Sequence, residues 1–290
     1  MSTPTFTEEI PDAAGPNWLG FASINKLIIF GDSYSSVGYD SKEPAPSAKN
    51  PLGVPFPGET YTEGGVEPNW VGHLVTSRKS VSHRLLVYDY AEGGSTIQGV
   101  RRQIEREFLP DDGQEAMCAP WDANDTLFVT WVGINDCAYT KKHEKDMERY
   151  FGLQEELYEF GARNFMFIDV PPISRTPAMP ALLRNEPSAA ATYNNWNEHL
   201  HKSSLKFQEK HRDAKVFLFS SSATFNRVLD SPEEHGFDVK DLYKRAGKIW
   251  MDHLHPTSAM HRWVAKDVEE FLMSKSPATE NPAQNAGQID

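Results

Sequence analysis

Two short segments that lie far apart in the sequence hold the residue types that ester cleavage needs. Ser33 ends the triplet Gly31-Asp32-Ser33, and Asp252 stands three residues before His255. A serine hydroxyl is a poor nucleophile until a base removes its proton, and an imidazole oriented by a carboxylate is the usual base. Asp252 and His255 can meet within one turn, which leaves the outer ring nitrogen free to face Ser33. These residues predict a nucleophilic triad for acyl transfer.

Each segment also has an ordinary structural interpretation. Asp and Ser are common turn and N-cap residues, so the first triplet could be a turn alone. In the second segment Asp252 or Thr257 could cap a helix, with the histidines on the surface. His253 is a rival base, and His253 with His255 could hold a metal, although no further ligands lie nearby in the sequence. The residues alone leave these alternatives open.

Four motifs in this order resemble the GDSL, or SGNH, hydrolase family: Gly31-Asp-Ser33, Ala91-Glu-Gly-Gly-Ser95, Val132-Gly-Ile-Asn-Asp136 and Asp252-His-Leu-His-Pro256. The match spans residues 26–272. The resemblance implies a serine esterase in which Ser33 is the nucleophile and His255, oriented by Asp252, is the base. His255 is chosen over His253 mainly because the family motif is Asp-x-x-His-Pro. The implied mechanism requires no metal and no organic cofactor.

The resemblance also assigns an oxyanion hole. Ester cleavage develops negative charge on the carbonyl oxygen, and preorganised donors aimed at that oxygen commonly contribute the largest catalytic effect. The implied donors are the N–H groups of Ser33 and Gly94 and the side-chain amide of Asn135. Gly93 is the adjacent alternative, and Gly94 is chosen because it lies five positions after Asp89, where relatives usually carry Asn. A side chain at residue 94 is expected to obstruct the approach of substrate.

The remaining polar residues of these motifs are predicted to be structural. Asp32 and Asp136 are interpreted as residues that stabilise their turns by accepting backbone N–H groups, and neither is the expected base. The substitution of Asp89 for Asn puts a supporting hydrogen bond in doubt, but not the mechanism. Three further serines are not expected to act as nucleophiles: Ser35, Ser36 and Ser95.

Three segments around the motifs look like the fungal carbohydrate acetylesterases grouped as family sixteen: Pro68-Asn-Trp70, Pro171-Pro-Ile-Ser-Arg-Thr-Pro177 and Trp250-Met-Asp-His-Leu-His-Pro-Thr-Ser258. This narrower resemblance suggests an acetylated sugar or hemicellulose oligosaccharide as substrate. Trp70 is either a stacking platform for the sugar or a core residue. Tyr34 and Trp70 are also expected to crowd the acyl side, so that acetyl fits better than longer chains.

Three other functions stay open. A GDSL lipase or phospholipase would use the same triad with a long apolar groove for the acyl chain. An acyltransferase would pass the acyl group to an acceptor other than water. A non-catalytic carbohydrate-binding protein would use the cleft without a competent triad, which the presence of all four motifs disfavours.

Five apolar runs, each of a length typical of buried strands, alternate with helical patterns. The runs are 26–31, 84–91, 125–133, 163–170 and 215–220, and the helical patterns include 97–108, 141–160, 189–210 and 257–272. This alternation predicts a three-layer doubly wound α/β sandwich around a five-stranded parallel sheet. The resemblance implies the flavodoxin-like order 2-1-3-4-5, which would bring Ser33, Gly94 and Asn135 to one edge of the sheet.

The domain organisation follows from composition along the chain. Residues 25–273 are predicted to form one catalytic domain, preceded by an N-terminal extension over 1–24. The segment 40–65 is rich in Pro and Gly and is predicted to be a long surface loop at the rim of the active site. Residues 274–290 are predicted to be a disordered tail because Ser, Pro, Asn and Gln dominate there.

Composition also narrows the partners and the location. A formal net charge of -12 disfavours nucleic acid as a partner, because phosphate binding needs a basic surface. No apolar stretch reaches the roughly 18 residues of a membrane span. Cys118 and Cys137 are too few for a disulfide framework, although one bridge between them stays open. No signal peptide is visible, so the chain is expected to be intracellular as written, or secreted if a signal has been removed.

Overall fold

The five predicted strands form one parallel sheet, and the predicted order β2-β1-β3-β4-β5 is confirmed. The computed structural model describes residues 15–78, 84–109, 121–141, 143–184 and 186–278. Its strands are β1 Lys26–Gly31, β2 Leu86–Asp89, β3 Thr126–Trp131, β4 Asn164–Ile168 and β5 Lys215–Phe219. All pairings are parallel, and Lys26 lies opposite both Leu86 and Thr126. The carboxyl ends of the strands therefore share one edge of the sheet.

The described part of the chain holds the α-helices α1 Trp70–Ser77, α2 Ile97–Arg102, α3 Ile134–Tyr139, α4 His143–Glu159, α5 Pro187–Lys210, α6 Ser221–Asp230 and α7 Ser258–Met273. The pattern over 97–108 corresponds to α2 and to the π-helical segment η4, Gln103–Phe108, that follows it directly. The sequence pattern does not predict α3 or α6, because a helix of six to ten residues is too short to show a clear periodicity. None of these helices has the length and apolar character that a membrane span requires.

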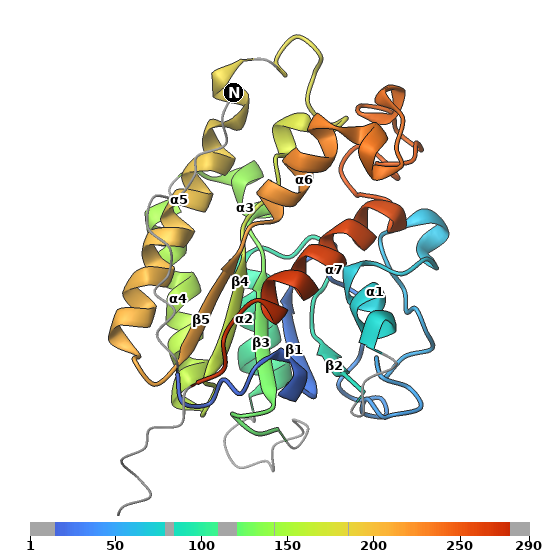
Figure 1. Ribbon diagram of the computed structural model, residues 1–290. Helices are drawn as coiled ribbons and strands as arrows, with labels where there is room; N and C mark the ends of the chain where they lie inside the picture. Colours follow the sequence, from blue (N-terminus) through green and yellow to red (C-terminus); the bar gives the residue numbers. More distant parts are fainter. Residues whose placement is uncertain (1–14, 79–83, 110–120, 142, 185, 279–290) are drawn as a thin grey trace, which may run out of the picture.

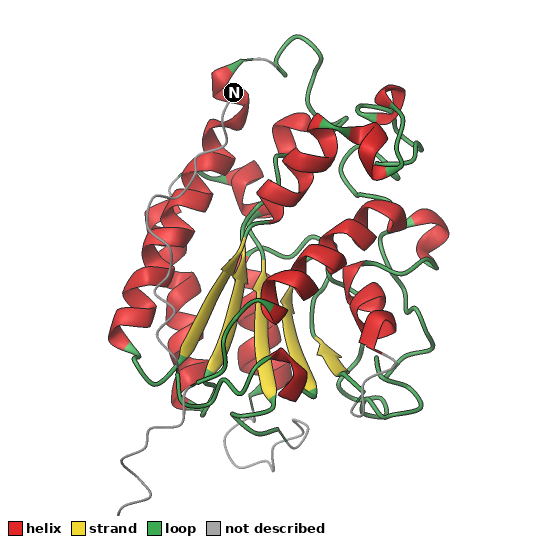
Figure 2. Ribbon diagram, in the orientation of Figure 1, coloured by secondary structure: helices red, strands yellow, loops and turns green. Residues whose placement is uncertain are grey.

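The helices cover both faces of the sheet, as a three-layer sandwich requires (Figure 1). On one face α7 packs against α1 and α6, and on the other α4 packs against α2 and α5. Figure 2 shows the strands as a twisted layer between these two groups. β3 and β4 are buried along their whole length because helices cover both of their faces. The predicted fold class is confirmed.

Parts of both chain ends are packed into the domain. Trp18, Phe21 and Ile24, within the predicted N-terminal extension, are buried in the core. The Ala278 N–H donates to the Trp18 carbonyl at 2.8 Å, so residues 274–278 are ordered against this segment. The predicted disorder of residues 279–290 falls outside the described residues. The part of the predicted N-terminal extension before residue 15 falls outside them as well.

The Pro- and Gly-rich segment 40–65 is irregular, with one short 3-10 helix, η2 Glu63–Gly65. Asn69 joins the end of this region to the turn after β1. Its side-chain amide donates to the carbonyls of Ser35 and Ser36, at 2.7 and 3.0 Å, and its Oδ1 accepts from Val71 and Gly72 at the start of α1. Asn69 thereby acts as an N-cap that also fixes the position of the loop.

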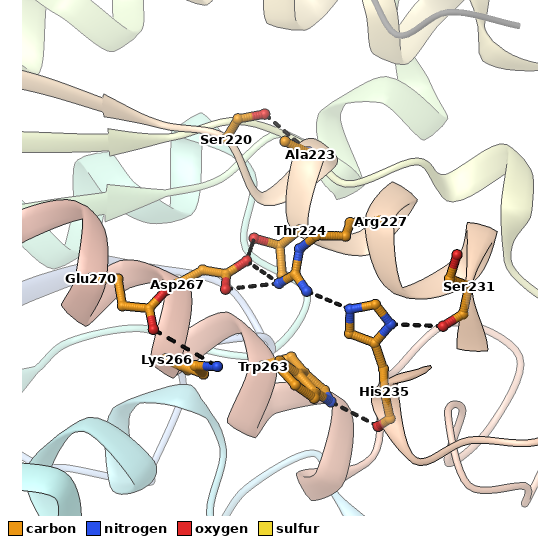
Figure 3. Close-up of polar contacts among 10 residues, drawn as sticks. All are labelled: Ser220, Ala223, Thr224, Arg227, Ser231, His235, Trp263, Lys266, Asp267 and Glu270. Carbon is orange, nitrogen blue, oxygen red and sulfur yellow. Dashed lines mark hydrogen bonds and ion pairs between the residues drawn. The ribbon is translucent and has the colours of Figure 1, made fainter. Parts of the chain in front are cut away.

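A polar network ties the segment after α6 to α7 (Figure 3). Arg227 on α6 donates from Nη2 to both carboxylate oxygens of Asp267 on α7, at 2.8 and 2.6 Å. His235 donates from Nδ1 to the Ser231 carbonyl at 2.7 Å, so its Nε2 is the acceptor for Arg227. Trp263 donates from its indole nitrogen to the His235 carbonyl at 3.1 Å. These contacts hold the first part of the connection between α6 and α7, residues 231–235, against α7.

Candidate active site

Ser33, His255 and Asp252 lie together at the carboxyl edge of the sheet. Ser33 follows β1 by two residues, and its Oγ lies 2.9 Å from His255 Nε2. His255 Nδ1 lies 2.7 Å from Asp252 Oδ2. Gly31 ends β1 where a Cβ would come within 2.3 Å of the Trp131 carbonyl oxygen, so only glycine allows this close approach of β1 to β3. The structure thus brings the three predicted residues into one hydrogen-bonded chain.

The segment that carries Asp252 and His255 is held by its own backbone. Asp252 Oδ1 accepts from the N–H groups of Leu254 and His255, both at 2.7 Å. Trp250 and Pro256 form an isolated antiparallel bridge that closes the turn. With Nδ1–H directed at the carboxylate, the imidazole presents an unprotonated Nε2 to the serine hydroxyl. This is the arrangement in which a histidine can accept the proton from Ser33.

The hydrogen bonds at Asp252 also determine its charge. Partial burial acts to raise the pKa of Asp252, but the hydrogen bonds from the His255 ring and from the Leu254 and His255 N–H groups outweigh it, so the pKa is lowered. Asp252 is therefore a carboxylate near neutral pH. It can orient the imidazole and stabilise the imidazolium that forms when Ser33 loses its proton.

His253 occupies a different place. Its side chain is 55% exposed, and its Nδ1 lies 3.9 Å from Asp252 Oδ1, beyond hydrogen-bond distance. Within the described ranges no group of three or more His, Cys, Asp or Glu side chains is arranged to hold a metal ion. His255 is the histidine that contacts Ser33.

The predicted oxyanion donors lie at the same carboxyl edge of the sheet. Asn135 lies in the first turn of α3, and its Nδ2 donates one hydrogen to the Ser95 carbonyl at 2.9 Å, which orients the amide and leaves the second hydrogen available. Gly94 adopts a φ of +77°, which glycine tolerates best. Among the described residues, the backbone N–H groups of Ser33 and Gly94 have no protein acceptor. Such unpaired donors can stabilise an oxyanion.

Comparison with known proteins identifies the family. The family of GDSL-like lipases and acylhydrolases matches residues 27–268. The chain belongs to the GDSL hydrolase family. It is therefore a carboxylic ester hydrolase. The chain is 36% identical to an acetylesterase from Thermothelomyces thermophilus over 86% of this chain and 88% of that protein.

Three further similarities have lower sequence identity. The GDSL hydrolase is 24% identical to a thermolabile hemolysin from Vibrio parahaemolyticus over 85% of this chain, and it covers 63% of that protein. Among solved structures it resembles an acetylxylan esterase from Geobacillus stearothermophilus, with a TM-score of 0.53, 15% identity, and coverage of 89% of this chain and 97% of the other. An α/β hydrolase from the metagenome of Lake Arreo gives a TM-score of 0.55 at 16% identity, with 88% and 97% covered. These two structures share the fold.

Two residues predicted to bind substrate do not line the site. Trp70 is fully buried, donates from its indole nitrogen to Ser35 Oγ at 3.1 Å, and packs against Trp131. Tyr34 is also fully buried, and its hydroxyl donates to the Leu254 carbonyl at 2.8 Å. The prediction of a sugar platform at Trp70 and of acyl crowding by both rings is wrong, because neither ring reaches solvent. Tyr34 instead holds the segment that carries His255.

The two glycines of the Gly93-Gly94 pair are required for different reasons. A Cβ on Gly94 would meet no protein atom within 4 Å, so within the protein it is the positive φ that favours glycine. A Cβ on Gly93 would lie 1.9 Å from the hydroxyl oxygen of Tyr61. Tyr61, from the 40–65 segment, therefore packs on Gly93. This contact places that segment at the rim of the site.

Gln103 is a further residue that sequence reasoning missed. It is fully buried in η4, where its Oε1 accepts from the Gly31 N–H at 2.9 Å and its Nε2 donates to the Gly31 carbonyl at 2.8 Å and to Ser95 Oγ at 3.2 Å. Gln103 thus joins the end of β1 to the loop that carries Gly94. One feature of the sequence could have indicated it: a polar residue lies between Val100 and Ile104, on the apolar side of a helical pattern.

Three carboxyl groups are buried where β1, β2 and β3 end. Burial raises the pKa of Asp32 to about 7 and the pKa of Asp136 to about 6, and it raises that of Asp89 well above its usual range. Each has one oxygen with no hydrogen-bond partner among the described residues. Burial therefore favours the neutral acids.

The other oxygens of these groups confirm the structural interpretation of Asp32 and Asp136. Asp32 Oδ1 accepts from the Tyr34 N–H at 3.1 Å, within its own turn. Asp136 Oδ1 accepts from the Ile97 N–H at 3.0 Å, so it binds the start of α2 and not only its own turn. The substituted Asp89 accepts from the Ala91 N–H at 3.0 Å. All three fix loops at the catalytic edge.

Asp32 should make stability depend on pH. Its folded-state pKa of about 7 exceeds the ordinary 3.8, so the folded state binds this proton more tightly than the unfolded chain. The free energy of unfolding should fall as pH rises from about 4 to about 7, with an Asp32 contribution on the order of 4 kcal/mol. Asp32→Asn keeps the acceptor for Tyr34 and should flatten this slope. Urea unfolding at several pH values measures it.

The matched control is Glu43→Gln, which changes an exposed carboxylate. It should leave the slope unchanged. An Asp32→Asn variant with the slope of the wild type would show that Asp32 does not bind a proton on folding.

Proposed function

We propose that this GDSL hydrolase removes acetyl groups from acetylated sugars or hemicellulose oligosaccharides through a Ser33-His255-Asp252 triad and an acyl-enzyme. The observation that carries the proposal is the unbroken chain of contacts from Ser33 Oγ to His255 Nε2, at 2.9 Å, and from His255 Nδ1 to Asp252 Oδ2, at 2.7 Å. The acetylesterase relative at 36% identity supports the acetyl group.

The proposed reaction has two halves. In the first, His255 Nε2 accepts the Ser33 proton as Oγ attacks the ester carbonyl carbon, and the N–H groups of Ser33 and Gly94 and the Asn135 amide hold the oxyanion. The imidazolium then gives its proton to the alcohol oxygen as the ester bond breaks. In the second half, His255 takes a proton from the water that attacks the acyl-enzyme, and returns it to Ser33 Oγ as the bond between the acyl carbon and Oγ breaks and acetic acid leaves.

A groove between α2 and α4 has polar side chains suited to hydroxyl groups, although none of the proposed triad residues or oxyanion donors lines it. Its volume is about 740 Å³, and Thr96 and Asp136, which line it, adjoin Ser95 and Asn135. Arg101 and Arg149 line its further part. Charged and amide side chains bind hydroxyl groups well and bind alkyl chains poorly. The groove therefore suits a sugar better than a lipid.

The alternative, a lipase or acyltransferase that handles a longer acyl chain, would need an apolar cleft, and one lies by the starts of α4 and α5, although no triad residue lines it. Its volume is about 720 Å³. Its apolar lining includes Met179, Leu183, Ala189, Ala191 and Tyr193. A chain that entered it would gain affinity with each methylene, up to about 0.8 kcal/mol.

Acyl-chain length separates the two functions. We expect kcat/KM on p-nitrophenyl esters to fall from acetyl to butyryl and to be very small for octanoyl. The leaving group is constant in this series, so only the acyl pocket is tested. Octanoyl esters as the better substrates would overturn the acetylesterase proposal in favour of the lipase.

A further inference from the structure

Tyr61 contacts the catalytic histidine from the side that faces solvent. Its ring centroid lies 5.2 Å from that of His255, with 28° between the ring planes. Its hydroxyl occupies the space that a Cβ on Gly93 would take. The phenol therefore extends from the imidazole to the loop that carries Gly94. It forms a wall of the site between the base and one of the oxyanion donors.

Tyr61 is also the accessible part of this wall. Tyr61 is 40% exposed, whereas the His255 side chain is 16% exposed and Ser33 is 6% exposed. An approaching substrate meets the phenol before it reaches the reacting atoms. Trp70, which the sequence suggested for this contact, cannot make it because it is fully buried.

The backbone on both sides of Tyr61 is fixed. The hydroxyls of Thr60 and Thr62 both donate to the Glu67 carbonyl, at 2.7 and 2.6 Å, and both residues are buried. Glu63 accepts the Ser258 N–H at the start of α7, at 2.7 Å. An exposed ring on an anchored segment is preorganised, so binding to it costs little conformational entropy.

The reaction determines which half of the ester lies against this ring. His255 Nε2 must give its proton to the alcohol oxygen, so the alcohol half lies next to the imidazole. The carbonyl oxygen points to the donors at Gly94 and Asn135. A ring stacked on the imidazole therefore borders the alcohol half. A flat aromatic face with a hydroxyl at its end can pack on the C–H face of a sugar ring and hydrogen-bond to its hydroxyl groups.

We propose that Tyr61 is a specificity-determining residue that stacks on the cyclic alcohol half of the ester, the sugar ring of an acetylated carbohydrate. The inference rests on the proposed catalytic roles of Ser33 and His255. It assigns to Tyr61 the selection of the alcohol, which is a separate property from the selection of the acyl group.

The test varies the alcohol at a constant acetyl group. Ethyl acetate, cyclohexyl acetate and acetylated xylobiose are compared on the wild type, Tyr61→Ala and Tyr61→Phe. We expect Tyr61→Ala to lower the ratio of kcat/KM for the two ring alcohols over ethyl acetate about ten-fold, chiefly through KM. Tyr61→Phe keeps the ring and should retain most of the cyclohexyl preference.

Tyr158→Ala is the matched control. The Tyr158 hydroxyl donates to Asp213, which precedes β5 at the opposite edge of the sheet, so its loss should leave the ratio unchanged. An unchanged ratio in Tyr61→Ala would overturn the inference. So would an equal fall in kcat on all three esters with a displaced acid limb of the pH profile, because Tyr61 would then only position His255.

These outcomes are distinguishable from failure of the proposed function. A wild type that cleaves cyclohexyl acetate but not acetylated xylobiose would refute the sugar substrate. In that case a lower cyclohexyl preference in Tyr61→Ala would still support a ring contact at Tyr61. A preference for octanoyl esters would refute the acetylesterase proposal without changing the alcohol series.

Discussion

Replacing Ser33 with alanine is expected to lower kcat on p-nitrophenyl acetate by a factor of about 10⁶, the scale seen when a comparable triad loses its nucleophile. Without Oγ no acyl-enzyme forms, and the remaining oxyanion donors give only a small residual rate. Steady-state hydrolysis at high enzyme concentration measures the loss. The fold should be retained, because Ser33 lies in a turn and its hydroxyl contributes little to the core.

Ser36→Ala provides the control for this variant. Ser36 is a similarly buried serine that follows the same strand, and only its carbonyl is used by Asn69. It should keep near-normal activity, and circular dichroism should show both variants folded. A folded Ser33→Ala enzyme with normal turnover would refute Ser33 as the nucleophile.

Replacing His255 with alanine should cost about as much as losing Ser33, because the two act as one unit and the loss of either disables the pair. In the proposed mechanism the imidazole accepts the serine proton as Oγ attacks, and then delivers it to the alcohol oxygen as the ester bond breaks. We expect kcat on p-nitrophenyl acetate to fall by a factor of about 10⁵–10⁶, with KM changed little.

His253→Ala is the matched control for His255→Ala. His253 lies two residues away and is mostly exposed. His253→Ala should keep turnover and the decline in activity at acid pH that comes from protonation of the base. If His253→Ala lost turnover and His255→Ala kept it, the roles of the two residues would be exchanged.

The strands were predictable because their apolar runs are long and bounded by turn residues. The order of the strands was not evident from periodicity, which is the same for any pairing, and it came from the family resemblance. The bounds were less accurate. The second run extends over 84–91, but β2 pairs only from Leu86 to Asp89. α3, which carries Asn135, has six residues and leaves too little pattern to detect.

The contacts among Ser33, His255 and Asp252 could be predicted because these residues occupy fixed places in short motifs. The roles of Trp70 and Tyr34 could not, because a single sequence does not show whether an aromatic ring packs inward or faces solvent. Tyr61 was missed for a related reason. It lies in an irregular segment without periodicity, and its importance comes from its position over His255, which is about 190 residues away in the sequence. A ring contact across such a separation is a property of the fold.

The contact between Trp18 and Ala278 makes the two ends of the described chain neighbours. Gly15 packs on the backbone of Ala214 and Lys215 at the start of β5, so this meeting point lies at the amino edge of the sheet. Chains whose ends lie close together tolerate circular permutation when the new ends open in an exposed loop. The loop around Leu182, which is 91% exposed, offers such an opening. The described chain therefore meets both conditions for circular permutation, close ends and an exposed loop.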